Sequence, residues 1–356
     1  MMNAAITFAL GACLVAVAIA DIRVMIGSTY TGPKGLNDLA TSMGEKYMGT
    51  TTDIKQLSDK FYATELNNTH NFGMISPANS MMWDATEAIQ GVFTFEDADA
   101  IVAFASKSGA QVRCQTLVSH KQVPNWVQRL EKAELLKAMS NHITNVMTHF
   151  GDVCSAWDVV SDVIEDDGSY RQSFWFKKTG KDYISTAFET ANAVKVKLKL
   201  KTRLYYNDFG ISIVNKKSDA VLEMVTSLRR KKIWVEGVGF KLHYRDSDSV
   251  AGAHIFNNFR RFTIKNMDVA ITKLDVTTST ANPTVIEQQK QVGIYTNVIS
   301  ACKKTKRCVG VTMSDFVDTY SSTKLSAPLL FYQPGGANTH LVRKASYDAI
   351  TSGWIL

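Results

Sequence analysis

The sequence predicts an α/β fold, a single (β/α)8 TIM barrel in which eight parallel strands are surrounded by helices. Short apolar runs typical of strands alternate along the chain with segments whose apolar residues have helical spacing. This alternation indicates a parallel sheet, and eight such units fit a closed barrel better than an open, doubly wound sheet. No glycine-rich nucleotide-binding loop opens a predicted helix, which also argues against an open nucleotide-binding sheet.

The strand-like runs are short, apolar and rich in β-branched or aromatic residues, as half-buried or buried strands are. They are residues 46–52, 71–76, 110–120, 154–161, 202–208, 235–244, 268–276 and 308–314. The clearest helical patterns lie between them, at 53–67, 133–150, 218–232 and 285–302. The chain of 356 residues is 45% hydrophobic, which is enough for one large core.

The N-terminal segment differs from the rest of the chain. Residues 4–20 are apolar and end in Ala18-Ile19-Ala20, which resembles a secretory signal peptide, although no Lys or Arg precedes it. An uncleaved membrane anchor is the alternative. We expect a signal peptide over 1–20, a barrel domain over 21–356, and a secreted, extracellular protein.

Secretion makes the cysteines informative, because disulfides persist in oxidising compartments. Without the predicted signal the chain keeps Cys114, Cys154, Cys302 and Cys308. Cys302 and Cys308 are close in sequence, and we expect them to form a disulfide that closes a short loop. Whether Cys114 and Cys154 pair stays open at this point.

The formal net charge is +7, with basic clusters at 177–181, 195–201, 229–232 and 303–307. Attraction to an anionic polysaccharide is one interpretation. Solvated helix ends and loops are the favoured one, because no aromatic residues alternate with the charges as they do in many nucleic-acid-binding segments. We expect no nucleic-acid partner, no metal ion and no cofactor, and no membrane association after signal removal.

The barrel fold predicts where the functional residues lie, because active sites of such barrels occupy the carboxyl ends of the strands. The polar residues at these ends are Asn79, His120, Ser161, Asp162, Asn207, Asp208, His243, Lys273, Asp275, Ser314 and Asp315. Rim residues are polar in any barrel, so this pattern alone does not define a site.

Seven segments together resemble glycoside hydrolase family 10, the (β/α)8 endo-xylanases. They are SPANSMMWDATEAIQGVFTFEDAD, QTLVSHKQVPNWV, AWDVVSDVIEDDGSYRQSFW, RLYYNDF, GVGFKLH, AITKLDV and the late CVGVT and APLLF runs. Their order and spacing agree from about residue 35 to residue 352. The resemblance implies a retaining mechanism with two glutamates, one acid/base at the end of strand four and one nucleophile at the end of strand seven.

On this sequence the resemblance assigns Asp162 to the acid/base position and Lys273 to the nucleophile position. Asp162 keeps a proton-transfer group on a side chain one methylene shorter. An ammonium group does not attack an anomeric carbon, and its charge opposes an oxocarbenium-like transition state. We therefore expect the chain not to be an enzyme, and we expect Lys273 to form an ion pair with Asp162.

The residues that line the sugar site are only partly kept. The resemblance implies that Asn79, Trp83, His120, Asn207 and His243 line a cleft. Other family positions differ, since the strand-six Gln is Lys241 and the strand-eight Trp is Ser314. The two lysines make the cleft more positive, which favours an acidic glycan over neutral xylan.

The function expected from these substitutions is that of a secreted xylanase-like pseudoenzyme, with a glycan-binding, decoy or structural role. Its partner would be a xylan-like or acidic polysaccharide, or another secreted protein. The first alternative is a residual endo-1,4-β-xylanase that acts through a rearranged carboxylate such as Asp275 or Asp315. The second is a different enzyme in which Lys273 forms a Schiff base with a carbonyl substrate.

Overall fold

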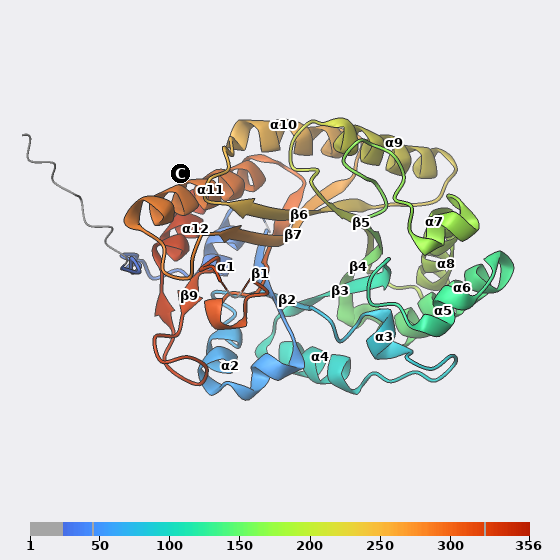
Figure 1. The fold of residues 1–356 in the computed structure, drawn as a ribbon, viewed down its shortest axis with the longest axis horizontal. Coiled ribbons are helices and arrows are strands. Elements are labelled where there is room, and N and C mark those ends of the chain that lie inside the picture. The colour runs from blue at the N-terminus through green and yellow to red at the C-terminus, as the bar shows by residue number, and fades with distance from the viewer. Residues whose placement is uncertain (1–23, 45, 324) are drawn as a thin grey trace, which may run out of the picture.

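The computed structural model describes residues 24–44, 46–323 and 325–356. The predicted signal peptide, 1–20, lies outside the described residues. Eight parallel strands form a closed barrel in sequence order, and helices form an outer ring around them (Figure 1). The predicted (β/α)8 barrel is confirmed.

The barrel strands agree with the predicted runs to within a few residues at each end. They are β1 (Tyr47–Thr52), β2 (Met74–Pro77), β3 (Gln111–Val118), β4 (Cys154–Ser161), β5 (Arg203–Phe209), β6 (Gly237–Arg245), β7 (Asp268–Thr277) and β8 (Cys308–Met313). The barrel closes where β1 pairs with β8. A small antiparallel pair, β9 (Phe331–Tyr332) and β10 (Val342–Arg343), follows the barrel and was not predicted.

Helices precede β1, fill the connections between the barrel strands and follow β10. They are α1 (Leu36–Ser42), α2 (Lys60–Leu66), α3 (Trp83–Thr86), α4 (Glu96–Ser108), α5 (Asn125–Arg129), α6 (Lys132–Phe150), α7 (Phe174–Thr179), α8 (Asp182–Leu198), α9 (Lys216–Arg230), α10 (Gly252–Thr263), α11 (Val285–Lys304) and α12 (Ala345–Ile355). The predicted helix over 53–67 is divided into a 3₁₀ turn, Ile54–Ser58, and α2. Asp59 divides them because its carboxylate accepts hydrogen bonds from the first amides of α2, as an N-cap does.

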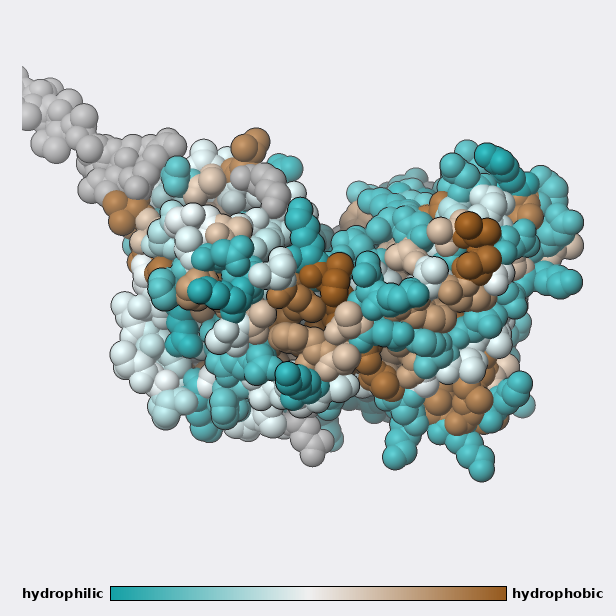
Figure 2. Space-filling model, turned by 90° about the horizontal axis from the view of Figure 1, so that it is seen from below, coloured by the Kyte–Doolittle hydropathy of each residue, from teal (hydrophilic) through white to brown (hydrophobic). Residues whose placement is uncertain are grey.

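Buried apolar side chains from the strands and the inner faces of the helices form one large core, and Ala156, Tyr205 and Ala270 form a small second cluster inside the barrel strands. On the face shown in Figure 2, hydrophobic residues gather in a band near the middle, between two more hydrophilic parts. Among the described residues, no helix combines the length and the apolar character needed to cross a lipid bilayer.

A polar network crosses the inside of the barrel below the rim. Arg113 on β3 forms a buried ion pair with Asp158 on β4. Asn207 on β5 donates to Asp158 over 2.6 Å and accepts from Thr272 on β7 over 2.8 Å. Gly239 on β6 makes room for this network, because a Cβ atom there would lie 2.5 Å from Oδ1 of Asn207. These bonds satisfy polar groups that would otherwise be buried without partners.

Two disulfides cross-link segments of the barrel. Cys302 at the end of α11 is bonded to Cys308 at the start of β8, which confirms that predicted pair. Cys114 on β3 is bonded to Cys154 on β4, which settles the pairing that the sequence left open.

Candidate active site

A groove lies at the carboxyl ends of the strands, where the fold predicts it. One cavity of about 380 Å³ is lined by Ala78, Asn79, Met82, Gln115, Thr116, Ser119, Lys121, Gln122, Ser161, Asp162, Phe209, Lys241, His243 and Lys273. A second, of about 470 Å³, is lined by residues 53–56, 79–80, 84–85, 97 and 122. Because Asn79 and Gln122 belong to both walls, the two cavities form one extended groove.

Asp162 is held firmly at the end of β4. Its backbone has a φ of 58°, in the left-handed region that Asp tolerates better than most residues. The amide of Asp162 donates to the carbonyl of Asn207 over 2.9 Å. The carbonyl of Asp162 accepts from Nε of Arg171 over 2.7 Å. These bonds fix the backbone, so the carboxylate is presented to the groove from a defined position.

The partner of the Asp162 carboxylate is Lys241 on β6. Nζ of Lys241 donates to Oδ1 over 2.9 Å and to Oδ2 over 2.8 Å. The prediction that Lys273 makes this ion pair is therefore wrong. Lys241 and Lys273 are register partners on β6 and β7, so either lysine was a candidate, and sequence alone does not say which one reaches Asp162.

Lys273 points into the groove without a counter-ion. Its ammonium makes no hydrogen bond or ion pair with any residue that the structure describes. Burial lowers the pKa of Lys273, the neighbouring charge of Lys241 lowers it further, and the carboxylates of Asp162 and Asp275 oppose this shift. An unpaired, poorly hydrated cation is unfavourable, so the site attracts a negative group.

His243 forms a second polar pair in the same wall. Its Nδ1 lies 2.6 Å from Oδ2 of Asp275, the residue opposite it in the register of β6 and β7. His243 is 47% exposed while Asp275 is largely covered. The contact at Nδ1 fixes the ring, and a histidine held in this way by a carboxylate can exchange a proton through its other nitrogen.

The remaining predicted lining residues are divided between the wall and the layer beneath it. Asn79 lines the groove, where it donates to Asp53 over 2.6 Å and accepts from Gln122 over 3.1 Å. His120 lies beside the groove, and burial lowers its pKa while Asp162 raises it. Nδ1 of His120 is buried without a hydrogen-bond partner among the described residues.

Trp83 and Asn207 lie below the surface instead of in the wall. Trp83 is 1% exposed and stacks on His142, with ring centroids 3.9 Å apart and planes 7° from parallel. Nδ1 of His142 in turn lies 2.9 Å from Oε2 of Glu87. Asn207 is fully buried in the network inside the barrel. Both residues support the rim from below.

Sequence reasoning missed Phe209, an aromatic residue that lines the groove and is 36% exposed. Nζ of Lys217 lies 3.6 Å from the centroid of its ring, and the guanidinium of Arg171 lies 5.7 Å away. Phe209 directly follows Asn207 and Asp208 at the end of β5, so its place at a strand end was the signal that could have identified it.

The titratable residues near the groove do not make a metal centre. Among the described residues, no group of three or more His, Cys, Asp or Glu side chains is placed to hold a metal ion. The chemistry that these residues themselves can supply is proton transfer by Asp162 and His243, and binding of negative groups by Lys273.

Comparisons with known proteins agree with this architecture. The sequence model of glycosyl hydrolase family 10 matches residues 35–352. An endo-1,4-beta-xylanase of Agaricus bisporus is 37% identical over 91% of this chain and 96% of its own. Endo-1,4-beta-xylanase A of Phanerodontia chrysosporium is 36% identical over 91% of this chain and 78% of its own.

Solved structures match equally far along the chain. The crystal structure of a family 10 xylanase from Bispora with xylobiose matches with a TM-score of 0.87 and 37% identity. The match covers 90% of this chain and 99% of the Bispora chain. Xylanase 10B from Thermotoga maritima has a TM-score of 0.82 at 28% identity, with 90% of this chain and 98% of its own covered.

Proposed function

The chain belongs to glycosyl hydrolase family 10, and from this membership we propose that it acts on xylan as an endo-1,4-β-xylanase. The observation that carries the proposal is the position of Asp162. It places a carboxylate in a long open groove at the end of β4, within a chain that aligns with xylanases over nine-tenths of its length. An extended groove suits attack within a polysaccharide chain.

This proposal replaces the interpretation of the chain as a non-hydrolytic pseudoenzyme, which the comparisons contradict. Relatives that are 36–37% identical over 91% of the chain are named endo-1,4-beta-xylanases. Those names favour the alternative of a xylan-degrading glycosidase.

The assignment of Asp162 and Lys273 to the acid/base and nucleophile positions is part of the proposal. It is supported by the places of Asp162 directly after β4 and of Lys273 in the second half of β7, because both side chains line the same cavity as Lys241. With an ammonium at the second position the enzyme has no carboxylate there to form a glycosyl–enzyme ester. We therefore assign it direct displacement by water, the route that inverts the anomeric carbon.

In this reaction the fraction of Asp162 that holds a proton, in place of one of its two hydrogen bonds from Lys241, donates that proton to the glycosidic oxygen as the bond from that oxygen to the anomeric carbon breaks. Water forms the new bond to the anomeric carbon and gives a proton to His243. Asp275 supports His243 by holding its Nδ1 and by offsetting the charge that the ring gains. Afterwards His243 releases its proton to solvent, and Asp162 takes up a proton from solvent. Phe209 offers an aromatic face for a sugar ring.

The unpaired ammonium of Lys273 sets the expected substrate preference. A xylan that carries carboxylates can place one beside this cation, whereas a neutral xylan leaves it without a partner. We therefore propose acidic, uronic-acid-bearing xylan as the preferred substrate. Secretion is part of the same proposal, supported by two disulfides of the kind that persist in oxidising compartments.

The test measures reducing ends released from xylan by a high concentration of protein covering residues 21–356. We expect slow release that Asp162→Asn lowers about a hundredfold, the usual contribution of a general acid. Glu189→Gln, on the outer helix α8, is the matched control and should leave the rate unchanged. No release by the unchanged protein, or equal release by Asp162→Asn, would overturn the proposal.

A further inference from the structure

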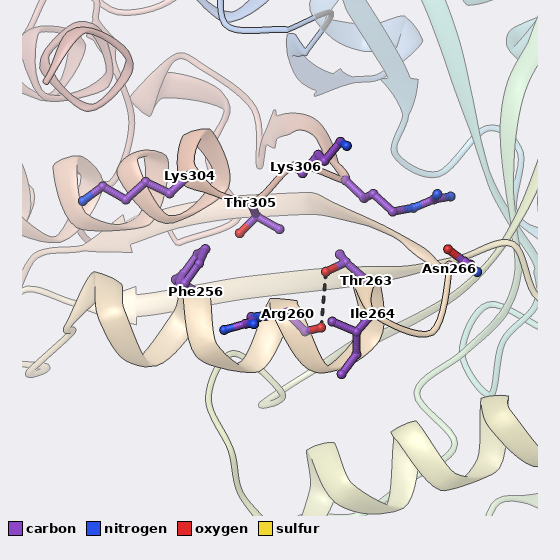
Figure 3. A pocket seen from close by; sticks show the side chains of 9 residues that line it. Phe256, Arg260, Thr263, Ile264, Asn266, Lys304, Thr305 and Lys306 are labelled. Atoms are coloured by element: carbon purple, nitrogen blue, oxygen red, sulfur yellow. Dashed lines mark hydrogen bonds between the residues drawn. The ribbon is translucent and has the colours of Figure 1, made fainter.

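A basic concavity lies at the opposite end of the barrel from the groove. It occupies about 430 Å³ between the end of α10 and the link from α11 to β8, near the strands' amino ends (Figure 3). Its lining is Phe256, Arg260, Thr263, Ile264, Asn266, Lys304, Thr305, Lys306 and Arg307. The lining therefore includes four cations and no carboxylate.

Most of this charge is not used inside the protein. Arg260, Lys304 and Lys306 make no side-chain hydrogen bond or ion pair with a described residue. Cations near helix C-termini stabilise the helix dipole, which accounts for Arg260 and Lys304. Lys306 and Arg307 follow the end of α11, so the dipole does not account for them.

An acidic residue next to the concavity, Asp268, already forms two ion pairs. Asp268, at the start of β7, pairs with Arg307 over 2.7 Å and with Arg203 over 2.6 Å. Burial lowers the pKa of the nearby Arg229, and the charges of Arg307 and Arg203 lower it further, while Glu236 and Asp268 oppose this shift. Because the lining holds four cations and no carboxylate, the local field is positive and favours an anionic ligand.

The basic loop is held in shape by two internal contacts. The Cys302–Cys308 disulfide closes the segment that carries Lys304, Lys306 and Arg307. Nζ of the buried Lys46 donates to the carbonyls of Thr305 and Cys308, over 2.9 and 2.5 Å. A preformed loop loses less conformational entropy when a ligand binds.

An exposed aromatic residue is connected to the concavity wall through Arg229. Trp234, between α9 and β6, is 52% exposed. Nη1 of Arg229 donates to the carbonyls of both Val235 and Asn266, over 3.2 Å in each case, and thereby ties the Trp234 segment to the concavity wall. The guanidinium of Arg229 lies 5.7 Å from the Trp234 ring centroid. The site therefore combines cations, hydroxyl and amide groups, and an accessible aromatic face.

We propose that this concavity and Trp234 form a second saccharide site, which binds a polysaccharide bearing carboxylates. The cations meet the carboxylates, Thr263 and Asn266 offer hydrogen bonds to hydroxyl groups, and Trp234 packs against a sugar ring. Because the site faces away from the groove, it can hold one part of a polymer while the groove acts on another, which raises the effective substrate concentration.

The test is calorimetric titration with an oligogalacturonate and with the same oligosaccharide after its carboxyls have been reduced to alcohols. Lys304→Ala/Lys306→Ala should weaken oligogalacturonate binding about tenfold, and Trp234→Ala should also weaken it. Lys107→Ala/Lys137→Ala removes the same charge from exposed helix positions elsewhere, and should change affinity less than twofold. All variants carry Lys273→Met, so that the groove's unpaired cation does not contribute.

Three results would overturn the proposal. One is an equal loss of affinity in the control pair, which would mean nonspecific charge attraction. Another is equal binding of the reduced oligosaccharide. The third is tighter binding of a single-stranded oligonucleotide of equal charge, which would assign the site to nucleic acid. Because titration does not depend on hydrolysis, Asp162→Asn should keep this binding even where the proposed xylanase activity fails.

Discussion

Lys241 holds the carboxylate of Asp162 with two hydrogen bonds, of 2.9 and 2.8 Å, across the rim from β6 to β4. Both side chains are largely covered, at 14% and 10% exposure, so solvent screens this pair less than a surface pair. The carboxylate that the proposed mechanism uses is thus oriented by a lysine, and a second lysine, Lys273, stands beside them without a partner.

The first prediction concerns the strength of this pair. A double-mutant cycle of Lys241→Met and Asp162→Asn, followed by chemical denaturation, should give a coupling free energy of about 1–3 kcal/mol, typical of contacting groups in one network. The cycle of Lys273→Met and Asp162→Asn is the comparison and should give a smaller value. The reverse order would show that Lys273 is the true partner in solution.

The pairing illustrates what the sequence could and could not provide. The period of apolar residues and the strand–helix alternation are local properties, so the barrel and its rim were predictable. Lys241 and Lys273 lie side by side on neighbouring strands, and the choice between them depends on side-chain direction and a register shift next to Lys241. Neither the side-chain direction nor the register shift can be predicted from a single segment of the sequence.

The burial of Trp83 and Asn207 was likewise not predictable from the sequence. Both follow polar or strand-end segments that the sequence places at the rim, yet both are buried. Trp83 is covered because it stacks on His142 from the distant helix α6. Asn207 is covered because Asp158 and Thr272 of other strands satisfy its amide. The sequence predicts that a residue lies near a strand end, but contacts with distant segments decide whether its side chain is exposed.

The second prediction restores a carboxylate at the proposed nucleophile position. Lys273→Glu removes the ammonium, which repels the positive charge that develops on the sugar in the transition state. At about 4 Å and an effective dielectric near 20, this repulsion is about 4 kcal/mol, or roughly a thousandfold in rate. We expect xylan hydrolysis to rise by about that factor. NMR of the first products should show inversion for the unchanged protein and retention for Lys273→Glu. Lys121→Glu, a change at the groove's exposed edge, is the charge control.

An unchanged rate in Lys273→Glu, with the variant folded by circular dichroism, would mean that this residue does not stand at the nucleophile position. Retention already in the unchanged protein would contradict direct displacement by water.

The third prediction concerns Asp208, buried below the groove at the end of β5. Burial first, and then the charge of Asp162, raise the pKa of Asp208 to about 7, although Lys217 opposes this. Between pH 4 and 7 the folded state therefore holds a proton that the unfolded state has lost. The free energy of unfolding should fall as pH rises through this range.

Asp208→Asn should flatten that part of the stability curve, measured by urea denaturation at several pH values. Asp219→Asn, an exposed carboxylate on α9, serves as the control and should leave the slope unchanged. A slope that is the same in the unchanged protein and in Asp208→Asn would mean that Asp208 is ionised throughout.

The fourth prediction is that Lys273 lowers the stability of the folded protein and contributes to ligand binding. A covered ammonium without a partner is unfavourable, so Lys273→Met should raise the free energy of unfolding by about 1–3 kcal/mol at pH 7. Because the pKa of Lys273 is lowered by folding, the unfolded state binds the extra proton, and the unchanged protein should gain stability as pH rises toward 10.5. That gain should be smaller in Lys273→Met, as urea denaturation from pH 7 to 10 can show.

The same variant separates stability from recognition. If the cation is kept to meet a carboxylate, Lys273→Met should bind a uronic-acid-substituted xylo-oligosaccharide more weakly while it binds unsubstituted xylohexaose as well as before. Carboxylate binding should also draw a proton onto Lys273, because a negative neighbour favours the ammonium. Calorimetry near pH 9 in buffers of different ionisation enthalpy would reveal this uptake. Equal affinity for both oligosaccharides, in the unchanged protein and the variant alike, would leave the lysine without a role in recognition.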